Sequence, residues 1–208
     1  MSEKLTEISS REFAKKLSAK VSVPGGGGAA ALVGAYAVAL CSMSANFTTG
    51  KKKYAEYEDD LQRILKQGDM LRERLLDLVE EDEAAFEPLS RAYGIPKEDP
   101  ERAGKLEEAT LVAIQPPLKM MRVIAESVLL LNEMLVKSSV LMVSDVGCGA
   151  MLAKAALTSA SLNVFINTKS LRDRDKAAEI EAEADELLSV YAPMADSIVD
   201  AVTKKLRG

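Results

Sequence analysis

Apolar residues recur at steps of three and four along most of the chain, and this spacing is typical of amphipathic α-helices. The clearest stripe runs through residues 54–92 and includes Ile64, Leu71, Leu75 and Leu78. No run of alternating apolar and polar residues stands between turn signals, as a half-buried strand would require. The pattern therefore predicts an all-α fold.

Capping residues and helix breakers divide the chain into helices. Ser9 and Glu12 form a capping box at the start of the first helix. Ser144 and Asp145 are predicted to cap a later helix, and the pair Pro116-Pro117 is predicted to end one. The predicted helices span residues 9–19, 29–47, 54–92, 100–115, 118–136, 146–162 with a continuation towards 167, and 174–206.

The helix at residues 29–47 is rich in alanine and carries no charged side chain. A helix that is apolar on all faces is surrounded by other elements, so we expect it at the centre of the molecule. It is slightly short for a membrane span and contains Ser42 and Ser44, which disfavours a membrane location. We find no repeat or linker, and predict one domain over residues 1–208: a multi-helix bundle around this buried helix.

Composition narrows the possible chemistry. The 208 residues contain no histidine, which excludes serine–histidine triads, histidine zinc sites and histidine bases. The net charge of -5 and the lack of a basic stretch argue against nucleic-acid binding. Residues 1–10 are charged and do not resemble a signal peptide, and Cys41 and Cys148 stand among apolar residues as expected of buried, reduced thiols. We therefore expect a cytoplasmic protein.

Asp82 breaks the local pattern, because it falls on the apolar stripe between Val79 and Phe86. A carboxylate at a core-facing position costs free energy unless it is paired or reaches a cleft. The alternative is a surface acid beside Glu81 and Glu83, with the stripe locally rotated.

Further candidates are a glycine run, three asparagines and a lysine run. Gly25–Gly28 precede a helix, where bare amides can face an anion, although a tight turn also needs glycine. Asn163 and Asn167 share a helix face, and they and Asn46 can either bind a polar heterocycle or cap helices. Lys51–Lys53 can hold carboxylates or be simply solvated.

The order of these motifs resembles one known family. Residues 23–30 (VPGGGGAA) resemble its Pro-Gly-Gly-Gly-small loop, and residues 46–54 resemble its next motif. Asp82-Glu83-Ala84-Ala85-Phe86 resembles its Asp-x-x-Ala-Phe helix, and residues 144–167 resemble its C-terminal signature. The family is the cyclodeaminase/cyclohydrolase group, which includes the cyclodeaminase part of formimidoyltransferase-cyclodeaminase and stand-alone methenyltetrahydrofolate cyclohydrolases. Gly28 departs from the serine that often follows the third glycine.

The resemblance implies an all-helical homodimer that acts on a tetrahydrofolate derivative, without a metal or a redox cofactor. It implies hydrolysis of 5,10-methenyltetrahydrofolate to 10-formyltetrahydrofolate, or cyclisation of 5-formimidoyltetrahydrofolate with loss of ammonia. Cyclohydrolase is the first expectation, because no formimidoyltransferase module is attached. A non-catalytic helical binding or dimerisation module is the alternative from another class.

The resemblance also suggests roles for the candidate residues. Asp82 is the first candidate for the general acid/base and Asp145 the second. The expected substrate-binding residues are Pro24, Gly25, Gly26, Gly27, Gly28, Asn46, Lys51, Lys52, Lys53, Tyr54, Ser144, Asn163 and Asn167.

Overall fold

A computed structural model describes residues 4–208, and every regular element in this part of the chain is a helix. The elements are α1 (Ser10–Leu17), α2 (Gly26–Asn46), the 3-10 helix η1 (Lys52–Tyr57), α3 (Glu58–Tyr93), α4 (Arg102–Lys137), the 3-10 helix η2 (Val140–Met142), α5 (Val143–Thr168) and α6 (Arg174–Arg207). The predicted all-α fold is confirmed.

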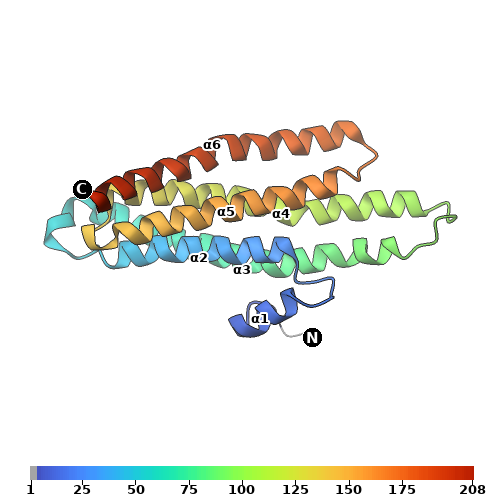
Figure 1. Cartoon of the computed structure of the whole chain (residues 1–208), viewed down its shortest axis with the longest axis horizontal. Helices are drawn as coiled ribbons and strands as arrows, with labels where there is room; N and C mark the ends of the chain where they lie inside the picture. The colour runs from blue at the N-terminus through green and yellow to red at the C-terminus, as the bar shows by residue number, and fades with distance from the viewer. Residues whose placement is uncertain (1–3) are drawn as a thin grey trace.

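The long helices lie side by side in an elongated bundle (Figure 1). Helix α2 packs between α3 and α5, α4 packs against α3 and α5, and α6 covers α4 and α5. Short α1 lies outside the bundle, and Thr6 just before it donates its backbone N–H to the Glu80 carboxylate of α3 at 2.9 Å. Paired α3 and α4 extend beyond the other helices at one end (Figure 1).

Small residues let α2 and α5 approach closely. A Cβ placed on Gly149 of α5 would lie 3.2 Å from the backbone oxygen of Ala37 on α2, and 2.8 Å from Cδ2 of Leu131 on α4. Ala37 and Leu131 are fully buried. The alanine-rich composition therefore sets the spacing of the central helices, because larger residues at this contact would push them apart.

The pair Pro116-Pro117 does not end a helix, so the prediction of two helices here is wrong. Helix α4 runs through both prolines from Arg102 to Lys137. Two prolines remove two backbone donors, at a cost of about 3 kcal/mol each in an isolated helix. Both rings are buried in the bundle, and this packing favours one continuous helix.

Ser9 caps α1 as predicted, since its hydroxyl accepts from the backbone N–H of Glu12 at 3.1 Å. Ser144 and Asp145 do not cap α5, because that helix already begins at Val143 and its cap residue is Met142. The preceding 3-10 turn η2 leads directly into α5, so both residues lie in its first turn.

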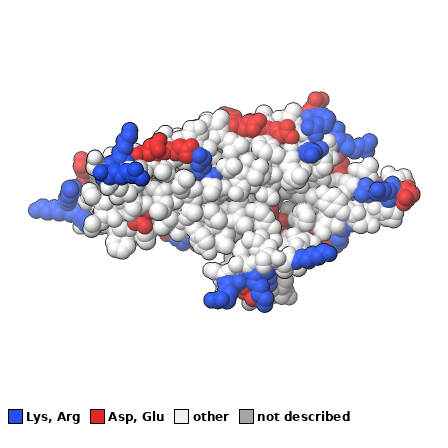
Figure 2. Space-filling model, viewed as in Figure 1, with Lys and Arg blue, Asp and Glu red and all other residues white. Residues whose placement is uncertain are grey.

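One side of the α2–α5 layer remains uncovered, and we call it the α2/α5 face. Its residues recur at steps of three and four, with one step of seven on α5: Ala29, Val33, Tyr36, Leu40 and Met43 on α2, and Ser144, Cys148, Met151, Ala155, Leu162 and Ile166 on α5. Figure 2 shows that the middle of this face is free of charged side chains, which gather along its edges and ends. Contrary to prediction, Cys148 is exposed, whereas Cys41 is buried.

Two helical stretches, Gly26–Asn46 and Val140–Thr168, are long and apolar enough to cross a membrane by length and composition. They are the two central helices, and 61% and 50% of their most apolar windows are buried inside the bundle. Packing against the other helices accounts for much of this apolar character. The apolar residues of these two helices that are not covered by other helices form the α2/α5 face.

We expect Gly149→Ala to destabilise the bundle by about 1–3 kcal/mol, because the added methyl group overpacks the contact with Leu131 and Ala37. The measurement is urea unfolding followed by circular dichroism at a fixed protein concentration.

Gly104→Ala is the matched control, because the added Cβ on α4 meets nothing within 4 Å. It should stabilise the protein by about 0.5–1 kcal/mol through helix propensity. Equal effects of the two substitutions would contradict the close contact of α2 and α5.

Candidate active site

A cleft opens where α2 begins, between the glycine loop, α3, α4 and the end of α5. Its volume is about 220 Å³. It is lined by Ser22, Val23, Gly25, Gly26, Gly27, Asp82, Phe86, Ala113, Pro117, Asn163, Ile166 and Asn167. The cleft thus combines the glycine run, Asp82 and two of the three predicted asparagines.

Among the residues that the structure describes, Asp82 is the only acidic one that lines this cleft. Burial raises the pKa of its carboxyl from 3.8 to about 6, while a hydrogen bond from the backbone N–H of Gly28 acts in the opposite direction. That N–H belongs to the first turn of α2, where the helix dipole also favours an anion. Such a carboxyl can both accept and return a proton near neutral pH.

The Asp82 carboxylate packs against bare backbone. A Cβ placed on Gly27 would lie 2.5 Å from both carboxylate oxygens, so no side chain fits at this position without moving Asp82. A Cβ on Gly26 would lie 3.3 Å from Nδ2 of Asn163. Gly26 and Gly27 therefore bring the backbone of α2 into contact with polar side chains of α5 and α3.

Asn163 and Asn167 lie one turn apart on α5 and face the same cleft. Nδ2 of Asn163 donates to the Ser159 carbonyl at 2.8 Å, and Nδ2 of Asn167 donates to the Asn163 carbonyl at 2.9 Å. These bonds orient both side chains. Each carboxamide retains its oxygen and one N–H for a ligand.

Apolar side chains complete the cleft: Phe86 from α3, Ala113 and Pro117 from α4, and Ile166 from α5. None of these, nor Ser22, was among the predicted site residues. Phe86 follows Asp82 by one helical turn, so the four-residue spacing could have predicted that both side chains face the same cleft. Pro117 was not predicted to line the cleft, because it was expected to end a helix. Nothing in the sequence singles out Ser22.

Gly28 does not face the cleft. A Cβ at this position would lie 3.7 Å from Cγ1 of Val79 and 3.8 Å from Cβ of buried Pro24, which are ordinary packing distances. A serine here would place its side chain among apolar neighbours. Gly28 contributes its backbone N–H to Asp82 instead.

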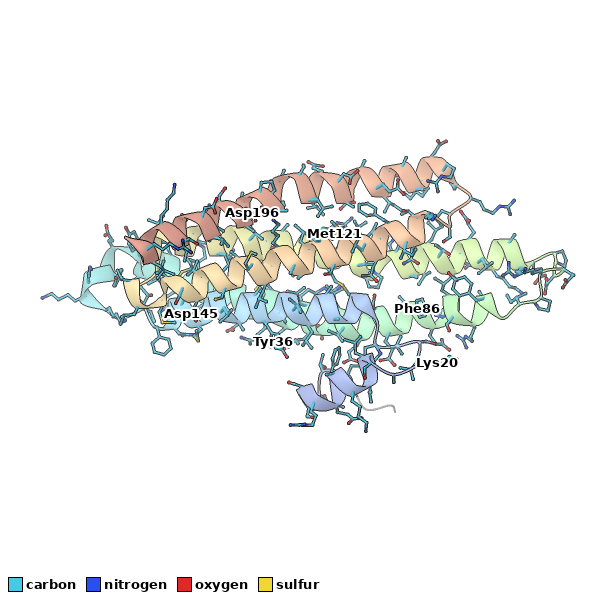
Figure 3. All side chains as sticks on the ribbon, in the orientation of Figure 1. Lys20, Tyr36, Phe86, Met121, Asp145 and Asp196 are labelled. Carbon is cyan, nitrogen blue, oxygen red and sulfur yellow. The ribbon has the colours of Figure 1, made fainter. Side chains whose placement is uncertain are left out.

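Pro24 is buried beside Gly28 and does not line the cleft. The remaining predicted site residues lie at the opposite end of the bundle. Asn46 ends α2, and Lys51 begins the segment that leads through Lys52 and Lys53 to Tyr54. Since α2 has 21 residues, its two ends are about 30 Å apart. Ser144 and Asp145 lie at the same far end, and Figure 3 shows Asp145 well separated from Phe86 along the bundle.

This second end has its own polar structure. The Tyr54 hydroxyl accepts from the backbone N–H of Val140 at 3.2 Å, and Nζ of Lys53 lies 5.6 Å from the centre of the Tyr54 ring. Both side chains line a cavity of about 430 Å³ together with Lys205 and Ser138. The Ser138 hydroxyl is buried and has no hydrogen-bond partner among the described residues.

A larger groove of about 460 Å³ lies between the extended parts of α3 and α4. Its basic side chains, Arg91 and Lys105, already pair with Glu87 and Glu101 on the surface, each at 2.6 Å. The Asp82 carboxyl, whose pKa is raised, lines the smaller cleft, so that cleft is the better candidate for chemistry. Within residues 4–208, no group of three or more cysteine or acidic side chains could hold a metal ion.

Comparisons with known proteins identify relatives of this chain. Residues 9–186 match the family described as formiminotransferase-cyclodeaminase. A methenyltetrahydrofolate cyclohydrolase from Methylorubrum extorquens is 39% identical over 198 residues, which cover 93% of this chain and 95% of that protein. The formimidoyltransferase-cyclodeaminase of Mus musculus is 30% identical over 81% of this chain, but only 32% of its own length is matched.

A solved structure shares the fold. The crystal structure of formiminotetrahydrofolate cyclodeaminase from Thermotoga maritima superposes with a TM-score of 0.82 at 30% identity, and the match covers 97% of both chains. The matched family region contains the glycine loop, Asp82 and both cleft asparagines. This chain therefore belongs to the formiminotransferase-cyclodeaminase family.

Proposed function

We propose that the protein is a methenyltetrahydrofolate cyclohydrolase, which hydrolyses 5,10-methenyltetrahydrofolate to 10-formyltetrahydrofolate. The observation that carries the proposal is Asp82, whose carboxyl lies in an apolar cleft with its pKa raised to about 6. The Methylorubrum extorquens relative, matched over nearly its whole length, supports this choice of reaction.

In the first step, the Asp82 carboxylate accepts a proton from water as the water oxygen attacks the methenyl carbon. The product is a neutral tetrahedral adduct with one hydroxyl group between two nitrogens. Burial makes Asp82 a stronger base than an exposed aspartate, and the Gly28 N–H orients its carboxylate.

In the second step, Asp82 returns its proton to nitrogen 5 as the bond between that nitrogen and the carbon breaks. The adduct hydroxyl loses its proton to solvent as the formyl carbonyl forms, so each turnover releases one proton. A single carboxyl with a pKa near neutrality can serve in both steps, and no histidine is required.

Asn163 and Asn167 hold the substrate in this scheme. Their oriented carboxamides offer acceptors and donors to the pterin ring, while Phe86 and Ile166 provide apolar contacts. Because both asparagines are fixed by bonds along α5, the ring is positioned with little loss of side-chain freedom.

Formimidoyltetrahydrofolate cyclodeaminase is the second candidate, and the nearly complete superposition on the Thermotoga maritima structure favours it. There nitrogen 10 replaces water as the nucleophile, and Asp82 would protonate the leaving ammonia. A non-catalytic binding module does not account for a partly buried carboxyl with a raised pKa that lines an open cleft.

Other properties are part of the same proposal. The reaction needs no metal and no redox cofactor, and we place the protein in the cytoplasm, without a membrane or nucleic-acid partner. We further propose a homodimer, because the uncharged α2/α5 face has the spacing of a helix-packing surface.

The function is tested by following the absorbance of 5,10-methenyltetrahydrofolate with purified protein. Loss of that signal faster than in buffer is the expected result. Its appearance from 5-formimidoyltetrahydrofolate would instead indicate the cyclodeaminase. No change with either compound, in folded protein, would refute both activities.

Asp82→Asn should lower kcat by about 10²–10⁴-fold, because a neutral amide cannot accept or return the proton. The substitution should not unfold the protein. The pKa of Asp82 is raised in the folded state, so folding favours the protonated form and stability is lost as pH rises from about 4 to 6. At about pH 8 the Asn variant should therefore be at least as stable as the wild type.

Asp77→Asn is the matched control, since Asp77 is an exposed aspartate on the same helix. It should leave kcat within about twofold. A loss below tenfold in Asp82→Asn, in protein that melts normally, would exclude Asp82 as the acid/base.

The pH profile provides an independent prediction. Because Asp82 begins the reaction as a base, kcat/KM should rise with pH and level off above an apparent pKa of about 6. The measurement is initial rate against pH with the spontaneous hydrolysis subtracted. The inflection should vanish in Asp82→Asn, and its persistence there would assign it to another group.

A further inference from the structure

The adjoining ends of α3 and α4 form an arm that projects beyond the other helices (Figure 1). We call residues 89–109 the α3/α4 arm. The arm and its base have an apolar cluster of their own, separate from the main core: Leu89, Ala92, Ala109 and Ala113 are buried, and Phe86, Ile95 and Leu106 pack against them. Segments with few buried apolar contacts open more readily than the core of a domain. The arm is therefore the part of the bundle that the main core stabilises least.

Three prolines lie where the arm joins the bundle. Pro88 is in α3, and Pro116-Pro117 is in α4. Because proline has no N–H, the carbonyls of Ala84, Val112 and Ala113 receive no hydrogen bond from the residue four positions later. Helices bend most readily where their hydrogen-bond ladder is interrupted in this way.

The interruptions in the two helices lie at the same level. Pro88 and Val112 line the groove within the arm, while Phe86 and Pro117 both line the cleft at Asp82. A bend in one helix alone would separate it from the other. Because both helices are weakened side by side, they can bend together and carry the arm as one unit.

Such a bend would move one wall of the cleft. Phe86 and Ala113 lie inside the two weakened segments, residues 84–88 and 112–117, and both line the cleft. Figure 3 shows Phe86 where the arm leaves the bundle. Asp82 lies before the weakened segment of α3 and stays with the bundle. The hinge therefore separates the apolar wall from the acid/base.

The size of the cleft indicates what the motion would change. Its volume of about 220 Å³ is below the range of about 300–1,000 Å³ that is typical of small-molecule pockets. Displacement of Phe86 and Ala113 would widen the cleft on the side of the arm. The wider state would admit a ligand that the present cleft encloses only in part.

One side chain ties the arm to the rest of the bundle. The Glu107 carboxylate accepts from the backbone N–H groups of Arg172 at 2.8 Å and Asp173 at 3.0 Å, in the connection between α5 and α6. Among the described residues, no other side chain of the arm hydrogen-bonds to an element outside α3 and α4. Hydrogen bonds to an ionised carboxylate are stronger than neutral ones, so Glu107 can hold the arm in place.

We propose that the α3/α4 arm is a hinged gate of the Asp82 cleft and that Glu107 is its latch. In the displaced state, Phe86 and Ala113 move away and the ligand enters or leaves. In the latched state, which is the one described here, these side chains close on the ring of the ligand. The identity of the ligand rests on the proposed function, whereas the motion of the arm is independent of the reaction.

Distances between two spin labels test the motion without any activity. In a Cys148→Ser background, labels are attached to Ala103→Cys on the arm and to Asp185→Cys on α6, two exposed helical positions. Cys41 stays unlabelled, because it is buried and burial raises the pKa of its thiol to about 12. Labelled protein is diluted into an excess of unlabelled protein, so that each distance lies within one chain. Double electron–electron resonance should give two distances.

A second pair of labels is the control for the bundle itself. Glu126→Cys lies on α4 beyond the prolines, and it is combined with the same Asp185→Cys label. This pair should give one narrow distance. Two distances here as well would place the motion outside the hinge and overturn the proposal.

Glu107→Ala removes the latch. It should raise the ratio of displaced to latched molecules by about tenfold or more, because two hydrogen bonds to a carboxylate are lost. Glu108→Ala is the matched control, since Glu108 is the exposed neighbour on the same helix. Pro88→Ala restores an N–H for the Ala84 carbonyl and should lower the ratio.

A single narrow distance for the arm pair that none of these variants changes would overturn the hinge. Equal shifts in Glu107→Ala and Glu108→Ala would overturn the latch.

Kinetics test whether the arm controls access to the cleft. Glu107→Ala should raise KM by about 3–10-fold, because fewer molecules are in the latched state, while kcat stays within about threefold. The pH inflection assigned to Asp82 should not move. Glu107→Gln keeps one acceptor oxygen and should recover part of the loss in KM.

The two measurements separate the gate from the reaction. Unchanged KM in an active enzyme whose label distances do shift would overturn the gate, because the arm would then move without affecting the cleft. An inactive wild type would refute the enzymatic function alone, since the distances test the hinge and its latch separately.

Discussion

The site depends on one contact, in which the Asp82 carboxylate packs against the bare backbone of the first turn of α2. The absence of a side chain at Gly27 allows this approach, and the Gly28 N–H gives the partly buried carboxylate a partner. Without the Gly28 donor, burying the Asp82 carboxylate would cost more free energy. Full exposure of that carboxylate would return its pKa to the ordinary value. The long helices therefore serve to hold α3 and α2 at this distance.

The helices were predictable because their apolar stripes have a regular period, and the all-α fold followed from that pattern. The exception is residues 116–117, where local rules predict a break but burial of both proline rings favours a continuous α4. Two prolines inside a helix cost a few kcal/mol of helix stability, and the packing of their rings in the bundle outweighs this cost. The start of α5 was misplaced for a similar reason, since η2 leads into the helix without a side-chain cap.

Asp82 could be found from sequence because it interrupts a stripe, whereas the location of the remaining site residues could not. Asn163 and Asn167 join Asp82 since α5 runs back alongside α2, which is a property of tertiary structure. Asn46, Lys51–Lys53 and Asp145 belong to the same family motifs but lie at the far end. Sequence order shows which motifs are present and does not reveal the distance between them.

The orientation of Gly28 affects how catalytic and non-catalytic members of the family can be distinguished by sequence. Its Cα faces Val79 and Pro24 at distances that leave room for a small group, and its contribution to the cleft comes from the main chain. Exchange among glycine, alanine and serine at this position changes a packing contact and leaves the donor to Asp82 in place. The residue type at position 28 is therefore a poor marker for separating catalytic from non-catalytic members of the family, whereas a side chain at position 27 would be a good one.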